Sequence, residues 1–151
     1  MEMAEIIARD CVLDRLTVSG KPQALSELAA RASAIANIDA RAIEKALKTR
    51  EDLGSTGVGQ GVAIPHARIE GLSRFVGLFA RLARPIDFMS IDAKPVDLVF
   101  LLLIPPNAGN KHVAALALIS RRMRDKKVLE GLRAAKSQGE LFDLLAGPVG
   151  E

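Results

Sequence analysis

The chain has 151 residues, of which 49% are hydrophobic and 26% charged, and its formal net charge is +3. This length suits one domain with a hydrophobic core and is short for two. No stretch reaches the roughly 18 consecutive apolar residues that a transmembrane helix needs. The acidic start, MEMAE, lacks the basic region of a secretory signal. We therefore expect a cytoplasmic protein without membrane insertion.

The cysteine and aromatic content argues against two further kinds of site, a cysteine-rich zinc site and a nucleic-acid-binding surface. Cys11 is the single cysteine, which excludes a disulfide within the chain and a cysteine-rich zinc site. Basic residues alternate with acidic ones, and there are five Phe but no Trp or Tyr, so few side chains can stack on bases. Nucleic-acid binding is a weak alternative, and we predict no nucleic-acid partner.

Two helices are predicted in the first third of the chain. Apolar residues from Leu25 to Ala36 recur at helical spacing. A second helix should run from Asp39, a suitable N-cap, to Leu53, and Gly54 should end it.

A glycine-rich segment and the expected strands follow. Residues 57–66 read GVGQGVAIPH, and glycine at three alternate positions predicts a loop that brings the backbone close to another group. Residues 62–64 should form a short strand that Pro65 ends. The stretches 74–82 and 98–104 are apolar on both sides, which is typical of strands covered by helices on two faces.

The last third is predicted to be helical. One helix should begin with Asn110 as its N-cap and carry His112 in its first turn. Two short helices are expected at 126–134 and 137–145. The whole pattern predicts an α/β fold, with residues 1–151 as a single domain and a mixed, mostly parallel sheet flanked by helices on both faces.

Each of the two histidines follows an expected strand. Because sites in open α/β sheets gather at the carboxyl ends of strands, His66 and His112 can lie on one edge. The pattern alone also allows surface or structural histidines. A zinc site from two histidines and a carboxylate lacks any short ligand spacing, so no metal is predicted. The glycines fit neither the dinucleotide fingerprint nor a P-loop.

The segment from Arg50 to His66, REDLGSTGVGQGVAIPH, strongly resembles the phosphorylation-site region of fructose/mannitol-type enzyme IIA domains of the bacterial phosphoenolpyruvate-dependent phosphotransferase system. The similarity continues through residues 85–88 and 95–100 and through His112, which covers nearly the whole chain. Within that family the chain is most similar to the stand-alone nitrogen-regulatory enzyme IIA. Two positions differ: Gln60 stands where Asn is commoner, and Ala67-Arg68 where Gly-Lys is common.

The resemblance implies roles for three principal residues. His66 should accept the phosphoryl group, His112 should hydrogen-bond that group or the first histidine, and Arg50 should face the phosphoryl oxygens. The chemistry agrees, because a neutral imidazole is nucleophilic near pH 7 and phosphoryl transfer depends mainly on positioning and charge stabilisation. No metal or other cofactor is required.

The same resemblance suggests phosphoryl-binding support from other residues. Ser55 and Thr56 lie where the family often has a hydroxyl near the site. Gly59 and Gly61 would let backbone N–H groups approach an anion. Without the resemblance, Ser55 would be assigned to a turn, and Arg68 to the solvated surface.

The implied function is a phosphocarrier that receives its phosphoryl group from a histidine-phosphorylated carrier protein. Its phosphorylation state would regulate partner proteins such as transporters or sensor kinases. One alternative is a sugar-transport enzyme IIA that passes phosphate to an enzyme IIB. Another, from a different class, is a nucleic-acid-binding or structural module. The sequence predicts neither the downstream partner nor the oligomeric state.

Overall fold

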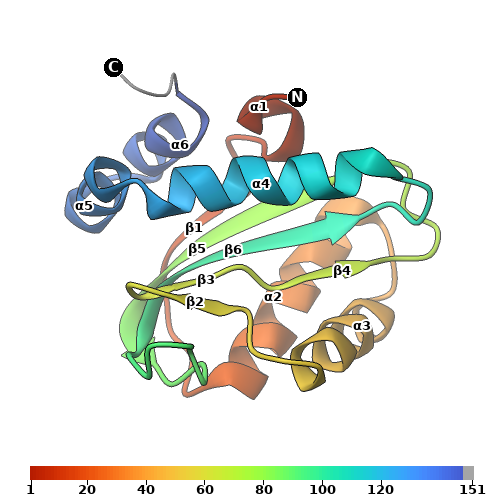
Figure 1. Ribbon diagram of the computed structural model, residues 1–151, viewed down its shortest axis with the longest axis horizontal. Coiled ribbons are helices and arrows are strands. Elements are labelled where there is room, and N and C mark those ends of the chain that lie inside the picture. The colour runs from red at the N-terminus through yellow and green to blue at the C-terminus, as the bar shows by residue number, and fades with distance from the viewer. Residues whose placement is uncertain (148–151) are drawn as a thin grey trace.

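A mixed sheet forms the centre of this computed structural model, which describes residues 1–147 (Figure 1). In chain order the elements are α1 (Met3–Ile6), β1 (Val12–Leu16), α2 (Lys21–Ala36), α3 (Ala40–Asp52), β2 (Gly57–Gly59), β3 (Val62–Ala63), β4 (His66–Arg68), β5 (Val76–Ile86), β6 (Val96–Ile104), α4 (Asn110–Arg124), α5 (Lys126–Ala134) and α6 (Gln138–Ala146). None of these helices is long and apolar enough to cross a bilayer.

The strand order is β1-β5-β6-β3-β2, and β4 also pairs with β6. The pairs β1–β5, β3–β6 and β4–β6 are parallel, whereas β5–β6 and β2–β3 are antiparallel. Helix α4 lies along one face of the sheet and α2 along the other (Figure 1). The predicted α/β fold with a mixed, mostly parallel sheet is therefore confirmed.

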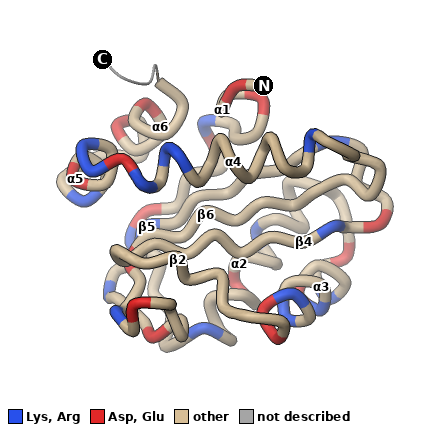
Figure 2. Tube along the Cα trace, viewed as in Figure 1, with Lys and Arg blue, Asp and Glu red and all other residues tan. Residues whose placement is uncertain are grey.

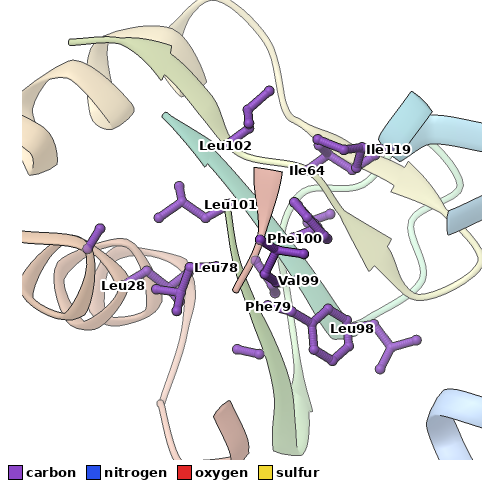
Figure 3. Packing of buried hydrophobic residues seen from close by; sticks show 14 of the residues in the cluster. Leu28, Ile64, Leu78, Phe79, Leu98, Val99, Phe100, Leu101, Leu102 and Ile119 are labelled. Carbon is purple, nitrogen blue, oxygen red and sulfur yellow. The ribbon is translucent and has the colours of Figure 1, made fainter. Parts of the chain in front are cut away.

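The central strand β6 carries the core on both of its faces. Its side chains alternate, so Leu101 points with Leu78 toward Leu28 of α2, whereas Phe100 points to the opposite side, where Ile119 of α4 lies (Figure 3). All five residues are buried. This two-sided burial explains why the sequence of β6 is almost continuously apolar.

Strands β3 and β4 extend one after the other along the same edge of β6. Val62 and Ala63 pair with the beginning of β6, and His66 pairs with Leu102 near its end. Pro65 interrupts the ladder because it has no N–H, but its carbonyl still accepts a bond of 2.9 Å from Leu102 N. The edge of β6 therefore fixes the backbone position of His66.

The predicted helices occur; α5 has the predicted bounds 126–134, and the ends of the others are shifted. Asp39 is the N-cap of α3, where its carboxylate accepts from Ala42 N at 3.2 Å. Helix α4 is capped by Gly109 rather than by Asn110, which is already helical. Helix α1 and strands β1 and β4 were not predicted, and β5 continues to Ile86 rather than ending at residue 82.

The expectation that residues 57–61 form only a loop is wrong, because Gly57–Gly59 is strand β2 of a tight hairpin with β3. Gly59, Gln60 and Gly61 have φ angles of 102°, 58° and 78°. Positive φ at the two turn positions, Gln60 and Gly61, is what a two-residue hairpin turn needs. Glycine therefore serves the turn here, and the strand follows from its pairing with β3.

Candidate functional site

A pocket of about 690 Å³ lies where α3, β4 and the start of α4 meet. The charged residues that line it within residues 1–147 are all basic, namely Lys45, Arg50 and Arg68, and both histidines join them. Among the described residues the lining comprises Ala42, Lys45, Ala46, Thr49, Arg50, Leu53, His66, Ala67, Arg68, Ile104 and His112. Figure 2 shows basic segments of α3 and β4 on the same side of the molecule. The pocket is therefore suited to an anion.

The His66 ring is held in one protonation form by the backbone. Its Nδ1 lies 2.8 Å from the carbonyl oxygen of Ile64. A carbonyl oxygen only accepts, so in the neutral ring Nδ1 carries the hydrogen and Nε2 keeps the lone pair. His66 begins β4 and is half-buried, so it lies in a strand and not in the predicted loop. The short strand expected at 62–64 does end before Pro65, because β3 is Val62–Ala63.

Burial lowers the pKa of His66, and the charge of Arg50 and the proximity of His112 act in the same direction. The bond to Ile64 and the charge of Glu51 oppose that shift. The ring is therefore mainly neutral near pH 7, which is the form in which Nε2 is a nucleophile.

The second histidine is also neutral, but it holds its hydrogen on the other nitrogen. His112 lies in the first turn of α4, and its Nδ1 is 3.3 Å from Arg68 Nε and 3.2 Å from Arg68 Nη2. Burial, followed by the charge of Arg68, lowers the pKa of His112. Because a guanidinium only donates, Nδ1 accepts and the neutral ring carries its hydrogen on Nε2.

Arg50 is fixed at the end of α3. Its Nη1 donates to the carbonyl of Gly54 at 2.8 Å, and it forms no salt bridge among residues 1–147. The neighbouring Glu51 is buried and pairs instead with Lys21 at 2.5 Å. Arg50 thus keeps N–H groups for an anion in the pocket.

The other four predicted support residues are not part of the pocket lining. Ser55 Oγ donates to the carbonyl of Phe88 at 2.6 Å and accepts from Gly57 N. Thr56 is buried, and its hydroxyl and N–H both donate to Glu51. These contacts fasten the turn after α3 to the rest of the fold.

The glycines lie at the hairpin turn. Gln60 N donates to Asp92 at 2.9 Å, and a Cβ on Gly59 would lie 3.4 Å from that carboxylate. A Cβ on Gly61 would clash with Arg133, which forms an ion pair of 2.8 Å with Asp97. The hairpin backbone therefore approaches protein side chains, where an approach to a bound anion had been expected.

Two basic lining residues were not predicted as part of the site. Lys45 lies on the α3 face that also presents Ala42, Ala46 and Thr49, and stepping back from Arg50 by helical spacing would have found that face. Arg68 had been treated as an ordinary surface charge. Within residues 1–147 no three His, Cys, Asp or Glu residues cluster to hold a metal ion.

Comparison with known proteins places the chain in a family. Residues 5–147 match the family described as phosphoenolpyruvate-dependent sugar phosphotransferase system, EIIA 2. A nitrogen regulatory protein of Bradyrhizobium diazoefficiens is 47% identical over 148 residues, covering 98% of this chain and 97% of that protein. The fructose-specific EIIA component of the Haloferax volcanii phosphotransferase system is 38% identical over 133 residues, covering 88% and 85%.

A solved structure supports the same assignment. The nitrogen regulatory protein IIA-Ntr of Neisseria meningitidis superposes with a TM-score of 0.88 at 35% identity, covering 95% of this chain and 98% of that one. Both the sequence and the fold match these relatives along nearly the entire chain. The chain belongs to the EIIA type 2 family of the phosphoenolpyruvate-dependent phosphotransferase system.

Proposed function

We propose that the chain is a regulatory phosphocarrier that accepts a phosphoryl group on Nε2 of His66. The observation that carries this proposal is the hydrogen bond of 2.8 Å between His66 Nδ1 and the carbonyl oxygen of Ile64, in a pocket that Lys45, Arg50 and Arg68 also line. That bond leaves the Nε2 lone pair available for attack. The donor would be a histidine-phosphorylated carrier protein.

The proposed step breaks one N–P bond and forms another. The Nε2 lone pair of His66 attacks the phosphorus of the donor's phosphohistidine, and the bonding electrons return to the donor's ring nitrogen. His66 gains positive charge as the bond forms, and the Ile64 carbonyl that accepts from Nδ1–H stabilises this charge. Arg50 faces the phosphoryl oxygens with its fixed guanidinium, and Nε2–H of His112 provides a neutral donor.

A regulatory role is favoured over sugar transport by the names of the relatives. The Bradyrhizobium and Neisseria proteins are both called nitrogen regulatory proteins, and they match nearly the full length of this chain. The fructose-specific relative keeps transfer to an enzyme IIB as the second candidate. The proposed setting is the cytoplasm, with transporters or sensor kinases as regulated targets.

The test is reconstitution with phosphoenolpyruvate, enzyme I and a histidine-phosphorylatable carrier protein, followed by intact-mass measurement. We expect the mass of one phosphoryl group on the wild-type chain, lost on mild acid treatment. Adding enzyme IIB domains then separates the two candidates, because a regulatory protein should retain the group while a transport component should lose it. No mass gain with an active carrier would contradict the proposed function.

A further inference from the structure

Arg68 and His112 form a contact that the phosphoryl-acceptor role alone does not explain. Arg68 is the last residue of β4, two positions after His66, and its side chain is exposed. Two of its nitrogens contact Nδ1 of His112, which lies 44 residues later in the sequence. Nε is at 3.3 Å and Nη2 at 3.2 Å. No salt bridge occupies Arg68 among residues 1–147.

This contact fixes the chemistry of His112 because arginine has no acceptor. Two donors aimed at Nδ1 exclude the ring form that carries its hydrogen there. The remaining neutral form has a single ring donor, Nε2–H. His66, by contrast, carries its hydrogen on Nδ1 and exposes a lone pair on Nε2. The two rings of the pocket therefore hold opposite tautomers, one suited to attack and the other to donation.

The surrounding charges also favour a neutral His112. The pocket that His112 lines also contains Lys45 and Arg50 from α3, and His66 and Arg68 from β4. His66 is neutral and the other three are cations, and no carboxylate among residues 1–147 lines the pocket. Burial of His112 and the nearby charge of Arg68 both oppose a proton added to this ring, whereas a neutral ring with one directed hydrogen avoids that cost.

We propose that Arg68 is a positioning residue, which holds the ring and the tautomer of His112 so that Nε2–H donates to the phosphoryl group carried by His66. This inference rests on the proposed function. It gives the long basic side chain of Arg68 a role in transfer, although the residue that accepts the phosphoryl group is His66. Arg68 acts through His112 and does not need to touch the reacting atoms.

The tautomer is measurable without any phosphoryl transfer. In ¹⁵N-labelled protein, nuclear magnetic resonance of the two imidazole rings reports which nitrogen of each is protonated, and His66→Ala assigns the signals. We expect wild-type His112 to be a single Nε2–H tautomer. In Arg68→Ala the signals should move toward a mixture of tautomers and the pKa of His112 should rise, because a donor and a nearby positive charge are removed.

Two further variants sharpen this test. Arg68→Lys should largely restore the Nε2–H tautomer, because an ammonium group also only donates. Arg84→Ala removes an exposed arginine of β5 outside the pocket and should leave both rings unchanged. Phosphoryl transfer to His66 should slow roughly three- to tenfold in Arg68→Ala, a modest effect because the contact is solvent-exposed.

The outcomes separate the two proposals. If wild-type protein is phosphorylated on His66 but His112 keeps the same tautomer and pKa in Arg68→Ala, the positioning role is wrong. Slower transfer with an unchanged His112 would likewise overturn it, since Arg68 would then act on the phosphoryl group directly. If the wild-type chain accepts no phosphoryl group, the proposed function fails, whatever the ring spectra show.

Discussion

The ends and the middle of one contiguous motif have different roles in this molecule. Arg50 and His66 mark its limits and both line the basic pocket, whereas Gly59, Gln60 and Gly61 between them form a hairpin turn held by Asp92 and by the Arg133–Asp97 pair. At the pocket, charged groups are left available for an anion. At the hairpin, they pair with each other and with the backbone. A sequence motif can therefore combine a chemical site with the scaffold that supports it.

The largest expected effect at the pocket is that of His66→Ala. It removes the only proposed nucleophile, so acid-labile phosphorylation should disappear completely. The fold should persist, because His66 is half-buried and the pairing of β4 with β6 uses its backbone. Intact-mass measurement after incubation with the phosphorylated carrier tests this, with circular dichroism as the control for folding. A phosphoryl group on the variant would place the acceptor elsewhere.

At the hairpin, Gly61→Ala should lower the free energy of unfolding by about 2–4 kcal/mol. About 1–2 kcal/mol of this comes from a side chain at φ 78°, and the rest from overpacking against Asp97, only 2.8 Å from the new Cβ. Chemical denaturation measures the change. Phosphorylation of the folded fraction should remain near the wild-type rate.

Gly71→Ala is a matched control for that variant. Its φ of 86° is similarly strained, but nothing lies within 4 Å of the added Cβ. It should therefore show only the backbone part of the destabilisation. Equal losses in Gly61→Ala and Gly71→Ala would mean that the close approach to Arg133 and Asp97 is unimportant. If Gly61→Ala folded but no longer accepted a phosphoryl group, the hairpin would contribute to phosphoryl transfer and would not be scaffold alone.

Arg50→Ala should slow phosphoryl transfer roughly ten- to hundredfold, because a charge-assisted hydrogen bond worth about 1.5–3 kcal/mol is lost in the transition state. His112→Ala should also slow transfer while leaving His66 able to accept the group. Rapid-quench measurement of transfer provides both rates. Arg41→Ala, an exposed arginine of α3 outside the pocket lining, should behave as wild type. Wild-type rates in Arg50→Ala and His112→Ala would make these residues bystanders.

Much of this fold follows from local sequence patterns, and the missed strands are those in which pairing outweighs the local pattern. Helix α3 was predicted with its N-cap because Asp39 and the apolar spacing act within a few residues. Strand β4 was missed because its partner β6 lies far along the sequence. Strand β2 was missed although its partner β3 follows directly after the turn, because its two glycines have low strand propensity. Glycine and Pro65 weaken the local strand pattern, and tertiary pairing overrides it.

The candidate site shows the same limit. Two histidines after expected strands were visible in the sequence, and the resemblance identified Arg50. The contact between Arg68 and His112 could not be predicted, because it joins the end of β4 to the start of α4, which are far apart in the sequence. Phosphoryl binding by Ser55 and Thr56 was expected from their place in the motif. Whether a hydroxyl can bind the group depends on the direction of its side chain, which the motif does not give. In the structure the two hydroxyls donate to Phe88 and Glu51.

The smallest expected effect is that of Ser55→Ala, which lies at the boundary between the two regions. The variant loses the 2.6 Å bond to the Phe88 carbonyl and the acceptor for Gly57 N, so stability should fall by about 1 kcal/mol. Transfer to His66 should be unchanged, because Ser55 is outside the pocket lining. Ser73→Ala, at an exposed serine, controls for loss of a hydroxyl. If Ser55→Ala slowed transfer without loss of stability, the hydroxyl would belong to the phosphoryl site, and the scaffold would begin only at the hairpin.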